Sequence, residues 1–161
     1  MSIEQGIETA SWMIAIALLY FYVPRRKYRE AHVSFLFMQV VTWLLGVITV
    51  ELKLLEYPVR FFSYTTRTSF TFEYFVFPVV SVMFNLYFPR EGIWIRKILY
   101  SLAFPTVLTI AEVILEVYTD CIEYIKWNWF YSWSSMLATL LLSYGYYKWF
   151  FSKHNNSIQQ D

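Results

Sequence analysis

Residues 24–50 read PRRKYREAHVSFLFMQVVTWLLGVITV, a basic run followed by an apolar stretch that holds no Asp, Glu, Lys or Arg from His32 to Val50. A bilayer core of ~30 Å needs about 20 helical residues, so this stretch is long enough to span a membrane. Outward from it, four further apolar stretches of similar length are separated by short connections. The sequence therefore predicts five membrane-spanning helices, at Ile7 to Val23, His32 to Val50, Ser69 to Phe88, Trp94 to Tyr118 and Trp127 to Phe151.

The composition agrees with a chain that lies largely in lipid. Hydrophobic residues make up 58% and charged residues 16% of the 161 residues, whereas soluble domains average roughly 45–50% and 25%. Helices are expected because open strands would leave backbone groups unpaired in lipid. The predicted fold class is thus all-α and polytopic, with residues 1–151 as a five-helix transmembrane domain and residues 152–161 as a polar cytoplasmic tail of low order.

Basic residues are distributed unevenly between the two sides that five spans define. Short cytoplasmic loops carry an excess of Lys and Arg, so the richer side is predicted to be cytoplasmic, with the N-terminus outside and the C-terminus inside. Glu4 and Glu8 precede the first span, whereas a secretory signal begins with positive charge, so this span is predicted to stay as an anchor. The richer side holds Arg25, Arg26, Lys27, Arg29, Arg90, Arg96, Lys97, Lys148 and Lys153, against Lys53, Arg60, Arg67 and Lys126 on the other.

Several function classes are excluded by composition and motif. The net charge of +1 comes without a broad basic field, which argues against a nucleic-acid partner. The single cysteine, Cys121, cannot form an internal disulfide. No phosphate loop, nucleophile elbow or His-rich metal spacing is present, so no metal and no cofactor are predicted. The remaining partners are the lipid bilayer and another membrane protein.

Polar residues recur at three- and four-residue spacing on the second, fourth and fifth spans. Small polar residues at this spacing allow helices to approach closely and to form hydrogen bonds worth ~0.6 kcal/mol on average. We therefore predict that these three stripes face one another and that the first span, which has no comparable stripe, lies at the periphery. On the second and fifth spans the stripe includes Gln39, Thr42, Ser132, Ser135 and Thr139.

Carboxylates within the spans are the strongest candidates for function. Glu112 lies roughly six residues inside the outer end of its span, about 9 Å deep at ~1.5 Å per residue. An ionised acid at the centre of a span costs about 2.5–3.5 kcal/mol, and Glu116, one turn away on the same face, raises the cost of ionising both. Glu73, near the outer end of the third span, completes a candidate ligand-binding site, and Arg60 and Arg67 from the outer loop would close it.

Three interpretations of these carboxylates remain open. They bind a cation or a small polar or lipid-like ligand, as in a minor transporter or an accessory subunit; or they form structural ion pairs in an assembly protein. The third is an intramembrane lipid-modifying enzyme, since carboxylates near the interface can act as general acid or base. In each case we expect at least one of Glu112 and Glu116 to be protonated, or bridged to Arg60, Arg67 or Lys53.

Three runs of the sequence carry a resemblance to a known family. They are FYVPRRKYRE at 21–30, EYPVRFF at 56–62 and EVILEVYTD at 112–120. The chain resembles a family of uncharacterised small multi-pass membrane proteins from spore-forming Gram-positive bacteria. Because that family has no established activity, the resemblance implies no catalytic residue. It implies a bacterial cytoplasmic or spore inner membrane, in an envelope or sporulation setting.

Overall fold

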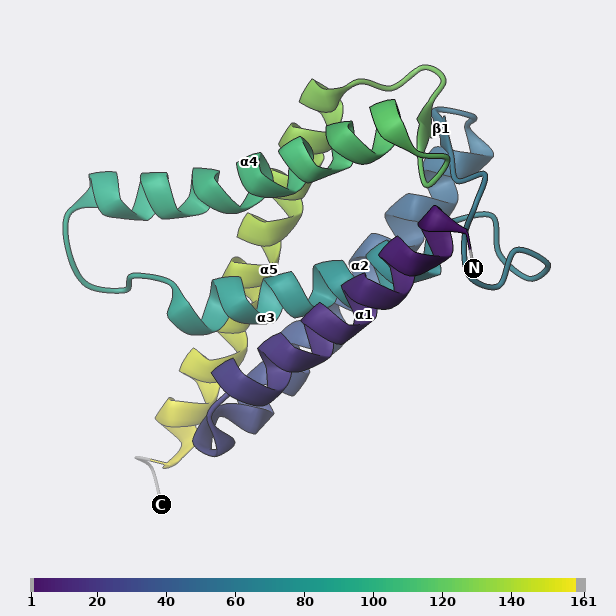
Figure 1. The fold of residues 1–161 in the computed structure, drawn as a ribbon. Coiled ribbons are helices and arrows are strands. Elements are labelled where there is room, and N and C mark those ends of the chain that lie inside the picture. Colours follow the sequence, from purple (N-terminus) through teal and green to yellow (C-terminus); the bar gives the residue numbers. More distant parts are fainter. Residues whose placement is uncertain (1, 159–161) are drawn as a thin grey trace.

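The structure, a computed structural model, describes the backbone of residues 2–158 and the side chains of residues 2–152. Long helices dominate it, and they alternate in direction along the chain (Figure 1). This confirms the predicted all-helical class. The predicted span Trp94 to Tyr118 coincides with a helix, and the others agree with helices to within a few residues at most ends. In chain order the helices are α1 (Ile3–Tyr22), α2 (Tyr28–Glu51), α3 (Phe77–Tyr87), α4 (Trp94–Tyr118) and α5 (Trp129–Ile158).

Four short elements complete the described chain. A 3₁₀ turn, η1 (Arg25–Lys27), leads into α2, and a π-helical segment, η2 (Phe70–Val76), leads directly into α3. The strands β1 (Leu55–Glu56) and β2 (Glu123–Tyr124) pair antiparallel, with Leu55 opposite Tyr124. This pairing, which the sequence did not predict, joins the α2–η2 connection to the α4–α5 connection.

Three segments of the fold are long and apolar enough to cross a membrane. They are Arg25–Glu51, Phe70–Tyr87 and Trp94–Tyr118, and they indicate a membrane protein. Large apolar side chains on the outer faces of the helices agree with contact to lipid. Phe21 is 75% exposed and Val40 is 68% exposed, although both lie within long helices. In water such a surface would be an aggregation hazard.

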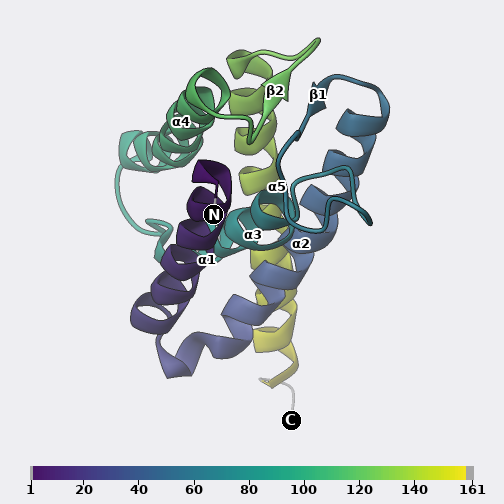
Figure 2. The ribbon, with the colours of Figure 1, turned by 45° about the vertical axis from the view of Figure 1, so that its right-hand side comes forward.

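The centre of the bundle is α3. Figure 2 shows this helix foreshortened in the middle, with α1, α2 and α5 around it. Val79, Val82, Phe84 and Asn85 are fully buried. A helix that is surrounded on all sides needs no single apolar face, so the sequence of α3 shows no polar stripe like those of α2, α4 and α5. By contrast, α1 packs mainly against η2 and α3, as expected of a peripheral helix.

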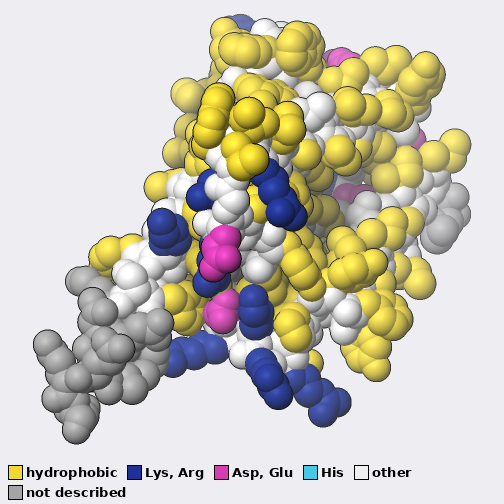
Figure 3. All heavy atoms as spheres, turned by 90° about the vertical axis from the view of Figure 1, so that its left-hand side faces the viewer, with side chains coloured by type: hydrophobic (Ala, Val, Ile, Leu, Met, Phe, Trp, Pro, Cys, Tyr) yellow, Lys and Arg dark blue, Asp and Glu magenta, His cyan; other side chains and the backbone are white. Residues whose placement is uncertain are grey.

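The two ends of the bundle differ in charge. At one end, which we call the basic end, residues 23–27 and 88–93 lie together with the last turns of α5. There Arg90 lies 3.8 Å from Glu30 of α2 and donates to the hydroxyl of Tyr147 of α5 at 2.6 Å. Figure 3 shows Lys and Arg side chains gathered on this end of the molecule. At the other end, the β end, the start of α1 meets residues 52–69 and 119–128.

The predicted low-order tail begins inside a helix. The helix α5 runs on to Ile158, so the backbone of residues 152–158 is helical and the predicted polar tail overlaps the end of α5. The polar cytoplasmic tail of low order stays a prediction. Residues 159–161 lie outside the described residues.

Candidate functional site

The site begins with the backbone of η2, the π-helical segment that carries Glu73. Pro78 has no N–H. In a π-helix this group would donate to the carbonyl group of Glu73, five residues earlier, and in an α-helix to that of Tyr74, four residues earlier. Where η2 changes into α3, both carbonyl groups therefore lack a donor within the helix. Two side chains of α2 replace it. The hydroxyl of Thr42 donates to the Glu73 carbonyl at 2.5 Å, and the amide of Gln39 donates to the Tyr74 carbonyl at 3.0 Å. These stripe residues therefore hold the segment that presents Glu73.

The Glu73 side chain is buried, with 6% exposure. Its Oε1 atom accepts a hydrogen bond from the hydroxyl of Tyr57 at 3.0 Å. Within the described residues its Oε2 atom has no hydrogen-bond partner, and the Thr68 side chain adds only a weaker polar interaction to the carboxyl group. Gly46 of α2 makes room for this group, because a Cβ atom there would overlap the carboxyl oxygens.

Glu112 of α4 is bound on a different wall. Its Oε1 atom accepts from the hydroxyl of Ser132 of α5 at 2.5 Å and from the hydroxyl of Tyr124. The indole N–H of Trp127 donates to the same Ser132 oxygen at 2.8 Å. The connection between α4 and α5 thus folds back over the bundle and supplies donors to a carboxyl group of the preceding helix.

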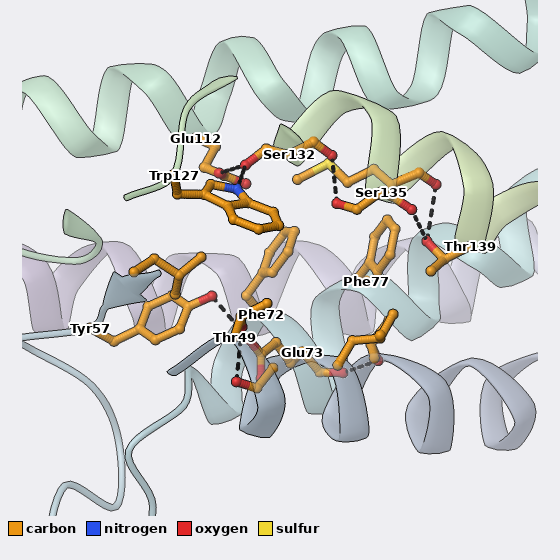
Figure 4. Close-up of a pocket in the computed structure, with 15 residues that line it drawn as sticks. Thr49, Tyr57, Phe72, Glu73, Phe77, Glu112, Trp127, Ser132, Ser135 and Thr139 are labelled. Atoms are coloured by element: carbon orange, nitrogen blue, oxygen red, sulfur yellow. Dashed lines mark hydrogen bonds between the residues drawn. The ribbon is translucent and has the colours of Figure 1, made fainter. Parts of the chain in front are cut away.

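Both carboxyl groups line one cavity of about 140 Å³ near the β end. In Figure 4, Glu112 lies on one side and Glu73 on the other, with the rings of Phe72 and Trp127 between them. No Lys, Arg or His belongs to the cavity lining among the described residues. The lining includes the predicted residues Thr42, Glu73, Glu112, Ser132, Ser135 and Thr139.

Two tyrosines of the connections act as hydrogen-bond donors in this site. Burial raises the pKa of Tyr57 well above its usual value, and the nearby charges of Glu73 and Glu112 raise it further. Burial also raises the pKa of Tyr124, as do the charge of Glu112 and its hydrogen bond. Both phenols therefore stay protonated across the physiological range, and each can donate to a carboxylate at any such pH.

The loop arginines do not close the site. The guanidinium of Arg60 donates to the carbonyl groups of Tyr57 at 2.5 Å, Ser63 at 3.3 Å and Thr66 at 2.8 Å, so it braces the loop itself. Arg67 is exposed and lies outside the cavity lining. The expected bridges from Arg60, Arg67 or Lys53 to a glutamate are absent from the described residues, where the Arg90–Glu30 pair at the basic end is the ion pair present.

Glu116 lies beside the site and not in it. It is half-buried, does not line the cavity, and contributes to the raised pKa of Tyr124 by its charge. The structure therefore places Glu112 and Glu116 near the same phenol, but it brings only Glu112 together with Glu73. The two glutamates lie one helical turn apart, as predicted. Only Glu112 lines the cavity, because it faces Ser132 of α5.

Another buried carboxylate was missed as a site residue. Glu8 of α1 is 6% exposed, and its Oε1 atom accepts from the backbone N–H of Phe61 at 3.2 Å and from the hydroxyl of Thr71 at 3.4 Å. It ties the N-terminal part of α1 to the α2–η2 connection and to η2. The signal for it in the sequence is a glutamate at the start of the first apolar stretch.

Comparison with protein-family models, with curated proteins and with solved structures gave no match to this chain. The chemistry of the cavity must therefore indicate the function. Two carboxyl groups without a basic partner can accept protons or bind a cation. Among the described residues, no three His, Cys, Asp or Glu side chains are grouped to hold a metal ion.

Proposed function

We propose that this chain crosses the membrane five times and binds a small cation in the cavity between Glu73 and Glu112. The N-terminus lies outside and the C-terminus inside. Apart from the three segments of clear membrane-spanning character, α1 and α5 have 20 and 30 residues and are long enough to cross. The gathering of basic residues at one end supports a cytoplasmic location for that end.

The observation that carries the proposal is the unpartnered Oε2 atom of Glu73. A carboxylate that is withdrawn from water without a counter-ion is costly, so a proton or a cation has to neutralise it. The structural ion-pair interpretation needs a basic side chain in the cavity, and the arginines that could supply it bond elsewhere or face solvent. Proton and cation then compete for the same oxygen, so cation binding weakens as the pH falls.

A cavity of this kind suits a minor transporter or an accessory subunit that senses or stores a cation. It also suits the bacterial cytoplasmic or spore inner membrane that the family resemblance implies. The cavity lies near the β end, which in the proposed orientation faces the outside. A cation from outside would thus reach Glu73 and Glu112 before it could reach the basic end.

Glu73→Gln is expected to weaken cation binding at least tenfold while the protein stays folded. The amide keeps the volume and an oxygen acceptor for Tyr57 but removes the charge that attracts a cation. The measurement is the rise in melting temperature of the purified chain in detergent, with sodium, potassium and ethylammonium chlorides at constant ionic strength, between pH 5 and pH 8. Glu51→Gln, an exposed glutamate at the end of α2, is the matched control.

Two results would contradict the binding proposal. The first is that no cation of the series raises the melting temperature of the unmodified chain. The second is that Glu73→Gln responds as strongly as the unmodified chain. If Glu73→Gln does not fold, Glu112→Gln serves in its place, since it removes the charge from the opposite wall.

The proposed topology predicts opposite labelling of two introduced cysteines. Tyr64, on the connection at the β end, is 103% exposed, and Glu91, on the connection at the basic end, is also exposed. In a Cys121→Ser background, a membrane-impermeant maleimide should label Tyr64→Cys from outside intact cells and Glu91→Cys only after lysis. The background is needed because Cys121 is itself near the β end, although burial raises the pKa of its thiol and slows its reaction.

The reverse labelling pattern would overturn the proposed orientation. Labelling of both introduced cysteines from outside would overturn the number of spans.

A further inference from the structure

The walls of the cavity are rich in aromatic rings. Tyr57, Phe72, Phe77 and Trp127 all line it, and they come from the α2–η2 connection, η2, the start of α3 and the α4–α5 connection. Tyr57 and Phe77 are buried, with 7% and 3% exposure. The negative face of an aromatic ring attracts a cation, most strongly where both are withdrawn from water.

The same walls suit a metal ion poorly. In proteins, calcium usually binds about six to eight oxygen ligands, and magnesium needs near-ideal octahedral geometry. Here the carboxyl groups of Glu73 and Glu112 lie on opposite walls (Figure 4). Among the described lining residues there is no third carboxyl group, and the α5 wall offers hydroxyl groups that bond to their own helix, Ser135 to the Ser132 carbonyl at 2.9 Å and Thr139 to the Ser135 carbonyl at 2.8 Å.

We infer that the cation is a small primary ammonium that carries an apolar group. This inference rests on the proposed binding of a cation at this cavity. The N–H groups of the ammonium would donate to Oε2 of Glu73, the oxygen that has no other partner, while Tyr57 holds Oε1. The ammonium would also lie against the rings of Phe72 and Trp127, and its apolar group would fill the rest of the cavity. A volume of 140 Å³ is close to the ~150 Å³ of an apolar cavity that holds benzene, which limits the ligand to about six heavy atoms.

Primary ammonium groups reach the outer face of a membrane from two sources. One is a free amine in the aqueous phase, and the other is the ethanolamine headgroup of a phospholipid. Both present the same –NH₃⁺ group next to a short carbon chain. Glu73 and Glu112 would meet the same ammonium group in both, so the two sources have to be separated by the lipid composition of the test.

The experiment titrates the purified full chain in detergent with ethylammonium, tetramethylammonium and sodium chlorides and compares their apparent affinities. Ethylammonium should bind at least tenfold more tightly than sodium, and also more tightly than tetramethylammonium, which has no N–H for Oε2. Phe72→Leu should reduce the ethylammonium-to-sodium ratio about fivefold, and Phe72→Tyr should largely keep it, since a cation over an aromatic ring is worth roughly 1 kcal/mol when partly desolvated. If Phe72→Leu does not fold, Trp127→Leu tests the same wall.

The outcomes separate this inference from the proposed function. Equal affinity for sodium and ethylammonium, with both lost in Glu73→Gln, overturns the ammonium inference and leaves cation binding standing. A ratio that Phe72→Leu and Trp127→Leu both leave unchanged also overturns it. Binding of none of the three cations overturns both.

A second arm identifies the source once ethylammonium binds. The chain is placed in nanodiscs of phosphatidylglycerol alone or of phosphatidylglycerol with phosphatidylethanolamine. A higher melting temperature with phosphatidylethanolamine, which disappears in Glu73→Gln, supports the headgroup as the ligand. Equal melting temperatures in the two lipids, with added ethylammonium still stabilising, support a free amine.

Discussion

Phe84→Ala is expected to lower the free energy of unfolding by about 3–5 kcal/mol, the usual cost of removing a buried phenylalanine from a packed core. Phe84 is fully buried on α3, and lipid cannot enter to fill the space that its ring leaves. The loss is therefore one of packing inside the protein, which drives helix association in membranes. The rings around Phe84 are Phe88, Tyr100, Phe104 and Tyr144, with centroids 5.6, 5.4, 5.3 and 6.4 Å away.

Phe21→Ala is the matched control for Phe84→Ala. Phe21 belongs to α1 and is 75% exposed. In the proposed five-span topology its ring contacts lipid, and lipid replaces the lost contacts. We expect its effect to stay below about 1 kcal/mol. The measurement is the unfolding of the purified chain by a denaturing detergent or by heat, followed by circular dichroism. Equal losses for the two variants would show that α3 is not the centre of the bundle.

Gly46→Ala is expected to destabilise the protein by about 1–3 kcal/mol, the range for overpacking a filled interior, and to abolish cation binding. A Cβ atom at this position would overlap the carboxyl group of Glu73, so the carboxyl group has to leave its place against α2. The hydrogen bond from Tyr57 to Glu73 would be lost with it. Melting temperature and the cation titration described above measure the two effects on the same sample.

Gly145 provides the control, since it also lies within a long helix but a Cβ atom there would meet nothing within 4 Å. Gly145→Ala should be neutral or stabilise by up to about 1 kcal/mol, because alanine is the better helix former. In the double variant Gly46→Ala with Glu73→Ala, the shorter side chain removes the overlap. Part of the stability should return, which appears as a coupling energy between the two positions. If Gly46→Ala proves as harmless as Gly145→Ala, the placement of the Glu73 carboxyl group is wrong.

The stripe on α2 has a more specific role than close packing. Gln39 and Thr42 bond to carbonyl groups that proline 78 leaves without a donor, and Gly46 admits the carboxyl group of Glu73. All three act on the segment that carries the proposed ligand-binding carboxylate. The polar residues of α2 therefore support the site, and the ligand itself would meet Glu73, Glu112 and the aromatic walls.

The sequence by itself determined the helices and the polar faces. Membrane thickness and the 3.6-residue period act locally, so a run of apolar residues predicted α4 from Trp94 to Tyr118 as observed. The same period predicted that the polar stripes with Thr42 on α2, Glu112 on α4 and Ser135 on α5 would face one another, and all three residues line one cavity.

Only the tertiary structure decided which of those faces meet and what closes the site. The pairing of β1 with β2 brings Tyr57 and Tyr124 from two separate connections to Glu73 and Glu112, and no local pattern encodes such a contact. Arg60 was expected at the carboxylates because opposite charges attract, yet carbonyl groups of its own loop are nearer and take its donors. The sequence also did not predict that α3 lies at the centre of the bundle, because a helix that is buried on every side has no single apolar face in its sequence. Contacts between distant segments depend on the register of whole helices, and a single sequence does not state that register.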